Sequence, residues 1–85
     1  MSPRPSILPI LPPSGDDAEL YAAWKLADQK WQREVEAITA YCYDPCERTR
    51  KAMDHAEILT AEAVTLLFDA HRDAERRKAL RQPAA

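Results

Sequence analysis

The sequence predicts an all-α fold: a long antiparallel hairpin of two helices, residues 16–43 and 45–81, preceded by a proline-rich arm. Three observations predict it. Five of the seven prolines and the only glycine lie within residues 1–15. Apolar residues then recur at steps of three or four, and a single Asp-Pro pair interrupts this pattern. The 85 residues suffice for one small domain. We expect an arm over 1–15, a hairpin domain over 16–82 and a frayed end over 83–85.

The first helix is predicted from an apolar stripe that contains both tryptophans of the chain. Asp16 with Glu19 forms one candidate capping box at its start, and Ser14 with Asp17 forms a competing one. At seven-residue spacing the tryptophans favour core packing over a role as binding anchors. The predicted stripe consists of Leu20, Trp24, Ala27, Trp31, Val35, Ile38 and Cys42.

The second helix follows a sharp turn at Asp44-Pro45. Asp44 is a candidate N-cap, Pro45 suits the first helical position, and Glu47 follows two residues later. A turn this short makes the helices antiparallel and pairs residues whose numbers add up to about 89. The predicted inner stripe is broad and rich in alanine: Cys46, Thr49, Ala52, Met53, Ala56, Leu59, Thr60, Ala63, Leu66, Leu67, Ala70 and Ala74.

Several large apolar residues fall outside both inner stripes, namely Leu26, Ile58, Phe68 and Leu80. Because a lone hairpin leaves them in water, we expect a homodimer that forms a four-helix bundle, or docking on a larger protein. Residues 52–70 carry four acids and no Lys or Arg, which gives an acidic waist. Glu34 lies at a stripe edge and is expected to pair with Arg50 or Lys51 or to face a partner.

These features indicate a small non-catalytic protein-interaction module, such as an adaptor, inhibitor or anti-regulator. Small helical proteins of this kind are frequent in phages and mobile elements. The arm, with polyproline II character, either wraps the hairpin or docks in a groove of a partner. The candidate contact residues are Glu34, Asp54, Glu57, Ile58, Glu62 and Phe68 on the helices, and Ile7, Leu8, Ile10 and Leu11 in the arm.

Nucleic-acid binding is an alternative function, which would use two basic groups at the ends of the hairpin. With 12 Lys and Arg against 14 Asp and Glu, the net charge of −2 argues against it. Cations near the end of a helix also complement the helix dipole. The candidate residues are Arg48, Arg50, Lys51, Arg72, Arg76, Arg77, Lys78 and Arg81.

Cys42 and Cys46 form a Cys-x-x-x-Cys motif at the predicted apex. The pair is distantly similar to the zinc hook at the tip of antiparallel coiled coils, in which two residues separate the cysteines. A metal site, a redox pair and two small buried residues are the alternatives, and the last is favoured. His55 and His71 are too far apart on one helix to share a site.

No nucleophile–base pair is legible, so we expect no enzyme activity, no cofactor and no small-molecule substrate. The prolines at positions 3, 5, 9, 12 and 13 interrupt every apolar run near the N-terminus. We therefore expect neither a signal peptide nor a membrane span, and a cytoplasmic location.

Overall fold

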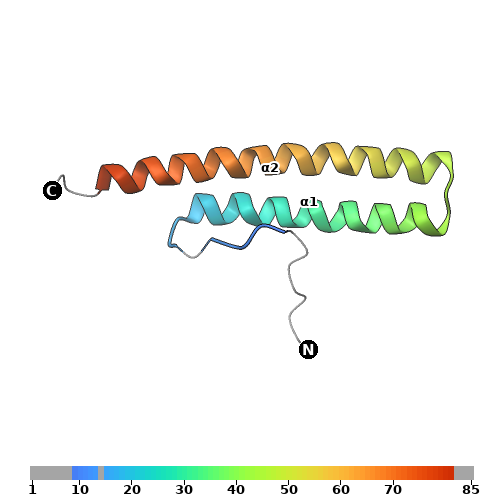
Figure 1. Ribbon diagram of the computed structural model, residues 1–85, viewed down its shortest axis with the longest axis horizontal. Helices are drawn as coiled ribbons and strands as arrows, with labels where there is room; N and C mark the ends of the chain where they lie inside the picture. Colours follow the sequence, from blue (N-terminus) through green and yellow to red (C-terminus); the bar gives the residue numbers. More distant parts are fainter. Residues whose placement is uncertain (1–8, 14, 82–85) are drawn as a thin grey trace, which may run out of the picture.

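The computed structural model describes residues 9–13 and 15–81. It consists of two helices, α1 (Ala18–Tyr43) and α2 (Glu47–Arg81), which run antiparallel along one another (Figure 1). The predicted all-α hairpin is therefore confirmed, and the described residues contain no strand. Ile7 and Leu8, which we named as candidate contact residues, lie outside the described residues. Neither helix is long and apolar enough to cross a membrane in the described part of the chain.

The first helix begins later than the capping-box pattern predicts. Asp17 is its N-cap, and its Oδ1 accepts a hydrogen bond from the backbone N–H of Leu20 at 3.1 Å. Asp16 is therefore not the cap, and Ser14 lies outside the described residues. A carboxylate at the N-cap satisfies one of the free N–H groups of the first turn. Asp17 caps the helix through Oδ1, and its Oδ2 is directed toward α2.

The apex differs from the prediction that Asp44 caps the second helix. The backbone N–H of Asp44 donates to the carbonyl of Ala40 at 2.9 Å, so Asp44 ends α1. The first helical bond of α2 runs from Arg50 N–H to the carbonyl of Cys46, also at 2.9 Å. The buried Thr49 hydroxyl accepts from the N–H of Cys46 at 3.1 Å and lies 2.7 Å from the Asp44 carbonyl, to which it donates. Thr49 thus closes the turn in place of the Asp44 carboxylate.

The helix interface follows a seven-residue repeat rather than the straight 3.6-residue stripe. Trp24, Ala27, the half-buried Trp31 and Glu34 are spaced by three and four residues. The predicted stripe contained Val35 instead of Glu34. It also contained Ile38 and Cys42, which the structure leaves exposed. Helices that wrap around each other keep a 3.5-residue period in contact, so a straight-helix stripe drifts off the interface along its length.

On α2 the same repeat places one of two neighbouring leucines in the helix interface and leaves the other exposed. Leu67 is buried at 4% exposure, whereas Leu66 is 54% exposed, so its predicted place on the inner stripe is wrong. Cys46 and Ala52 are exposed as well. The buried apolar cluster is small and lies toward the open end of the hairpin: Trp24, Ala27, Ala63 and Leu67.

Two contacts fix the register between the helices. The Thr60 hydroxyl lies 3.1 Å from the carbonyl of Lys30 and shares its proton with the carbonyl of Ala56 at 3.0 Å, and the Arg77 guanidinium reaches Asp17 at 2.7 Å. The residue numbers of the first pair add up to 90, which agrees with the predicted register, and the second pair, which adds up to 94, is joined through the long side chain of Arg77. The two helices meet at the apex, and α2, with 35 residues, is nine residues longer than α1, with 26, so α2 extends past the start of α1 at the open end (Figure 1).

Candidate functional site

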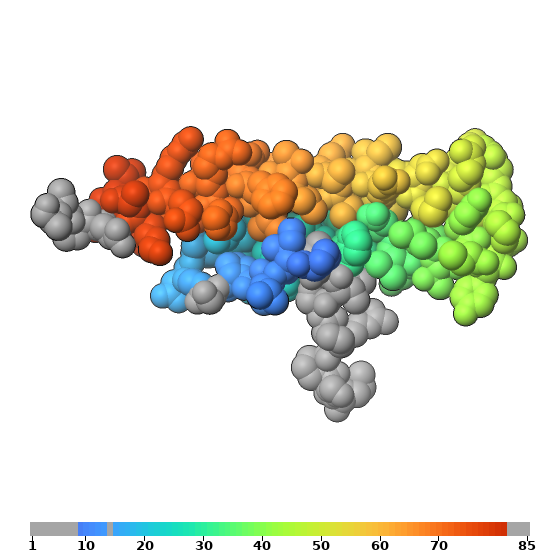
Figure 2. Space-filling model, in the orientation of Figure 1, coloured from blue at the N-terminus to red at the C-terminus, as the bar shows by residue number. Residues whose placement is uncertain are grey.

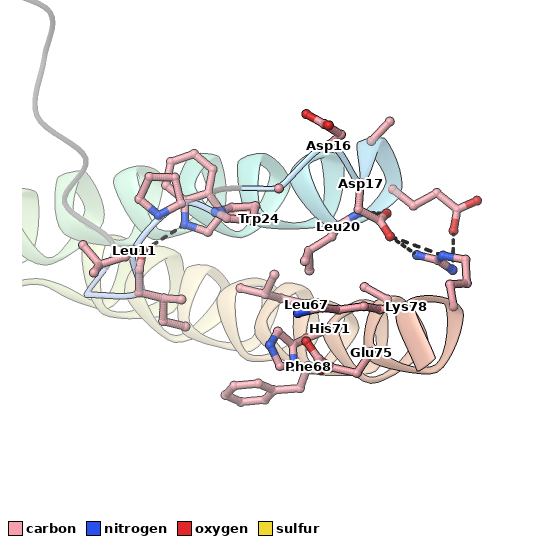
Figure 3. A pocket seen from close by; sticks show the side chains of 18 of the residues that line it. Leu11, Asp16, Asp17, Leu20, Trp24, Leu67, Phe68, His71, Glu75 and Lys78 are labelled. Carbon is pink, nitrogen blue, oxygen red and sulfur yellow. Dashed lines mark hydrogen bonds and ion pairs between the residues drawn. The ribbon is translucent and has the colours of Figure 1, made fainter. Parts of the chain in front are cut away.

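A carboxylate clamp closes the open end of the hairpin. Asp17 Oδ2 accepts hydrogen bonds from Arg77 Nη2 at 2.7 Å and from Arg77 Nε at 3.2 Å, and Glu19 lies 3.2 Å from Arg77 Nη1 (Figure 3). The hydrogen bond from Arg77, together with that from Leu20 N–H, lowers the pKa of Asp17 below its ordinary value. The same contact raises the pKa of Arg77. One side chain thus caps α1 and ties it to the last turns of α2.

The described part of the arm packs on α1. Trp24 Nε1 donates to the carbonyl of Ile10 at 2.9 Å, and Ile10 packs against the buried cluster. The ring of Tyr21 lies 5.9 Å from that of Trp24 between centroids. Figure 2 shows residues 9–13 in blue against the surface of α1. Leu11 remains 88% exposed, so only one of the two described aliphatic residues of the arm is packed.

An open groove of about 1150 Å³ lies between the arm and the ends of both helices (Figure 3). Its apolar lining includes Leu20, Trp24 and Leu67, and its rim carries both acidic and basic residues. Because the groove is open and its rim is of mixed charge, it does not select one class of ligand.

The outer face of α2 carries two of the four large apolar residues that the sequence placed outside the stripes, Ile58 and Phe68. Ile58 and Phe68 are each 59% exposed, and Phe68 points away from α1 (Figure 3). With the exposed Ala61 and Thr65 between them, they repeat at steps of three and four. Ile58, Ala61 and Thr65 each lie two positions from a buried residue, which is about 200° around the helix, whereas Phe68 follows the buried Leu67 and also lines the groove. We call the six residues along this line the outer seam: Asp54, Ile58, Ala61, Thr65, Phe68 and Arg72.

Acidic side chains lie at the start of the outer seam and beside its middle part. Asp54, Glu57 and Glu62 are all exposed. Glu34 is different: it is 8% exposed and sits in the α1 interface. The expected pairing of Glu34 across the hairpin is absent from the described residues. Arg50 pairs instead with Glu47 and Asp54 on its own helix, and Lys51 pairs with Glu47.

Most cations of the two basic groups have a carboxylate neighbour. Arg48 pairs with Asp44, Arg72 with Asp69 and Arg76 with Asp73, at 3.3–3.8 Å. Arg77 is held by the clamp. In the described part of the chain, Lys78 and Arg81 have no carboxylate within ion-pair distance. The structure therefore does not gather the eight predicted cations into one unpaired basic surface, and partly neutralised cations attract phosphate less strongly.

Both cysteines are free and exposed at the apex, so the prediction that they are buried is wrong. Cys46 Sγ lies 3.5 Å from the Thr49 hydroxyl. The hydrogen bonds from Thr49 lower the pKa of the Cys46 thiol. Among the residues that the structure describes, no three His, Cys, Asp or Glu side chains gather in a group suited to a metal ion.

Sequence reasoning did not identify the residues that join the two helices. Arg77 was assigned only to the basic end, and Asp17 only to a competing capping box. The signal was their placement, since an acid at the start of one helix and a base near the end of an antiparallel neighbour lie side by side. Thr60 was assigned to the apolar stripe, where its hydroxyl in fact bonds the backbone of α1.

No family model, no curated protein and no solved structure matches this chain.

Proposed function

We propose that the protein is a non-catalytic protein-interaction module, of the adaptor, inhibitor or anti-regulator type, and that its contact surface is the outer face of α2. The observation that carries this proposal is the exposure of Ile58 and Phe68 on α2, at 59% each. The Phe68 side chain points away from α1 (Figure 3). A helix that repeats apolar residues on two opposite faces is suited to pack between two neighbours. The hairpin itself supplies only one neighbour.

The size of the hairpin core supports the same proposal. The buried apolar cluster consists of four residues, two of them alanines. Burial of apolar surface stabilises by about 25 cal/mol per Å², and a core of this size gives a small domain only modest stability. Covering Ile58 and Phe68 with another protein would remove further apolar area from water and stabilise the folded chain through binding.

The charge around this face gives it selectivity. Asp54, Glu57 and Glu62 are exposed beside the apolar residues, and residues 52–70 contain no Lys or Arg. Complementary charge at the rim of an interface mainly raises the association rate and disfavours wrong partners. The acidic residues favour a partner that carries cations at matching positions and disfavour a nucleic-acid duplex along this part of α2.

Site-specific photo-crosslinking in the native host tests the proposal. A photoreactive amino acid replaces Phe68 in one full-length variant and Leu80, which is 86% exposed on the same helix, in a matched control. We expect protein adducts from position 68 and a much lower yield from position 80. Equal yields at both positions, or no protein adduct at position 68, would overturn the proposed contact surface.

A further inference from the structure

We infer that the outer seam of α2 binds the outer seam of a second copy of this chain in antiparallel orientation. The inference rests on the proposed function and deepens it by naming the partner of the same surface. It is argued from the order of charged and apolar residues along the seam, together with their exposure.

The seam is self-complementary about a two-fold axis at position 63. An antiparallel pairing in which residue numbers add up to 126 places Ile58 opposite the partner's Phe68 and Ala61 opposite the partner's Thr65. The same register places Asp54 opposite Arg72 of the partner subunit. A two-fold axis repeats each contact, since both copies present the same surface. The apolar centre is thus flanked at both ends by an acid–base pair.

The pairing continues one step farther along the seven-residue repeat. Lys51, one turn before Asp54, comes opposite Glu75 of the partner subunit, and both residues are exposed on α2. With symmetry, the seam therefore offers four intermolecular ion pairs around its apolar centre. In the isolated chain, Lys51, Asp54 and Arg72 form only exposed pairs within their own helix, at 3.3–3.9 Å. Exposed pairs of this kind contribute little, so the side chains are available to a partner.

Small residues at the axis suit this contact. Ala61 and Thr65 lie between Ile58 and Phe68 and allow two helices to approach closely. The positions beside the seam face the partner's positions on the same side, so their numbers add up to 124 or 128 instead of 126. They add two more complementary pairs, because Glu57 comes near the partner's His71. His55 likewise comes near the partner's Asp69.

The same register opposes Glu62 to Glu62 of the partner subunit at the axis. Replacing this pair of like charges is therefore expected to strengthen the association.

A parallel arrangement of the same seam is disfavoured. In register, it would place Asp54 opposite the partner's Asp54 and Arg72 opposite the partner's Arg72. Like charges at facing positions destabilise a helix pair, whereas the antiparallel register matches opposite charges at every charged seam position from 51 to 75. The charge order therefore selects the orientation as well as the partner.

Sedimentation velocity on the full chain over a range of concentrations tests the inference. We expect a reversible dimer, loss of dimer in Phe68→Glu and retention of dimer in the matched control Leu80→Glu. Asp54→Arg alone and Arg72→Asp alone should each raise the dissociation constant of the dimer about tenfold, because symmetry changes two pairs at once. The double variant Asp54→Arg, Arg72→Asp should restore it, and Glu62→Gln should lower the dissociation constant.

A wild-type chain that stays monomeric at every concentration would overturn the inference, as would a double variant no tighter than the single ones. Circular dichroism of each variant verifies that the exposed substitutions leave the helices intact. A monomeric chain whose position 68 crosslinks to a different protein would refute self-pairing and support the proposed function. A monomeric chain without protein adducts would refute both.

Discussion

The two tryptophans of α1 differ in the hydrogen bonding of the indole Nε1 group. This difference predicts that replacement by phenylalanine affects the stability of the chain in opposite directions at the two positions. Trp24 Nε1 donates to the Ile10 carbonyl, whereas Trp31 Nε1 is buried without a hydrogen-bond partner among the described residues. Trp24→Phe removes a hydrogen bond with a net value of about 1 kcal/mol. Trp31→Phe removes a buried unsatisfied N–H group, which costs about 1–3 kcal/mol in the wild type.

Both variants lose the same ring atoms, so much of the lost apolar packing cancels in the comparison. We expect Trp24→Phe to be less stable than Trp31→Phe by about 2 kcal/mol, which is roughly a 30-fold difference in the unfolding equilibrium constant. Urea unfolding followed by circular dichroism at a single low protein concentration measures the difference, because helix content does not depend on the altered fluorophores. Equal stabilities, or a less stable Trp31→Phe, would refute the reasoning.

Three further predictions concern the core, the clamp and the apex. Leu67→Ala should lower the free energy of unfolding by about 2–5 kcal/mol, whereas Leu66→Ala should change it by less than about 1 kcal/mol; comparable losses would contradict the register. The pKa of Asp17 is lowered in the folded chain, so its contribution to stability is present above the ordinary value of 3.8 and is lost as pH falls through the lower folded value. The stability difference between wild type and Asp17→Asn should therefore shrink in acid, and a pH-independent difference would argue against the clamp. At neutral pH, Cys46 should react with iodoacetamide faster than Cys42, since its thiol pKa is lowered; mass spectrometry of peptides at short times measures the ratio, and preferential labelling of Cys42 would contradict it.

The helices and the turn were predictable because they depend on local pattern. Gly15 and the arm prolines mark where the helical pattern begins, and Asp44-Pro45 marks where it is interrupted. The exact helix starts were not predictable in this way. They depend on which of several nearby side chains reaches the free N–H groups, and Asp17 and Thr49 do so in the folded hairpin.

The inner residues were predictable on α2, where the predicted stripe contains all five buried residues, and less completely on α1. Trp24 and Ala27 belong to both the straight stripe and the wound interface, whereas Glu34 belongs only to the latter. The buried residues of α1 are spaced by three and seven residues, as in the 3.5-residue period of a coiled coil, and a straight-helix stripe departs from that period along its length. The Asp17–Arg77 contact joins residues 60 apart in the sequence and depends on the final register, which no local pattern contains.

Phe68 is the only phenylalanine of the chain, so fluorine NMR of 4-fluorophenylalanine-labelled protein reports directly on the outer face of α2. The solvent isotope shift of its signal measures exposure to water. We expect a large shift at low micromolar concentration and a smaller one as the chain associates or binds a protein partner. A small shift at every concentration would mean that the ring is already covered in the isolated chain. A shift that stays large at millimolar concentration and in host extract would mean that nothing binds this face, and either result would contradict the account.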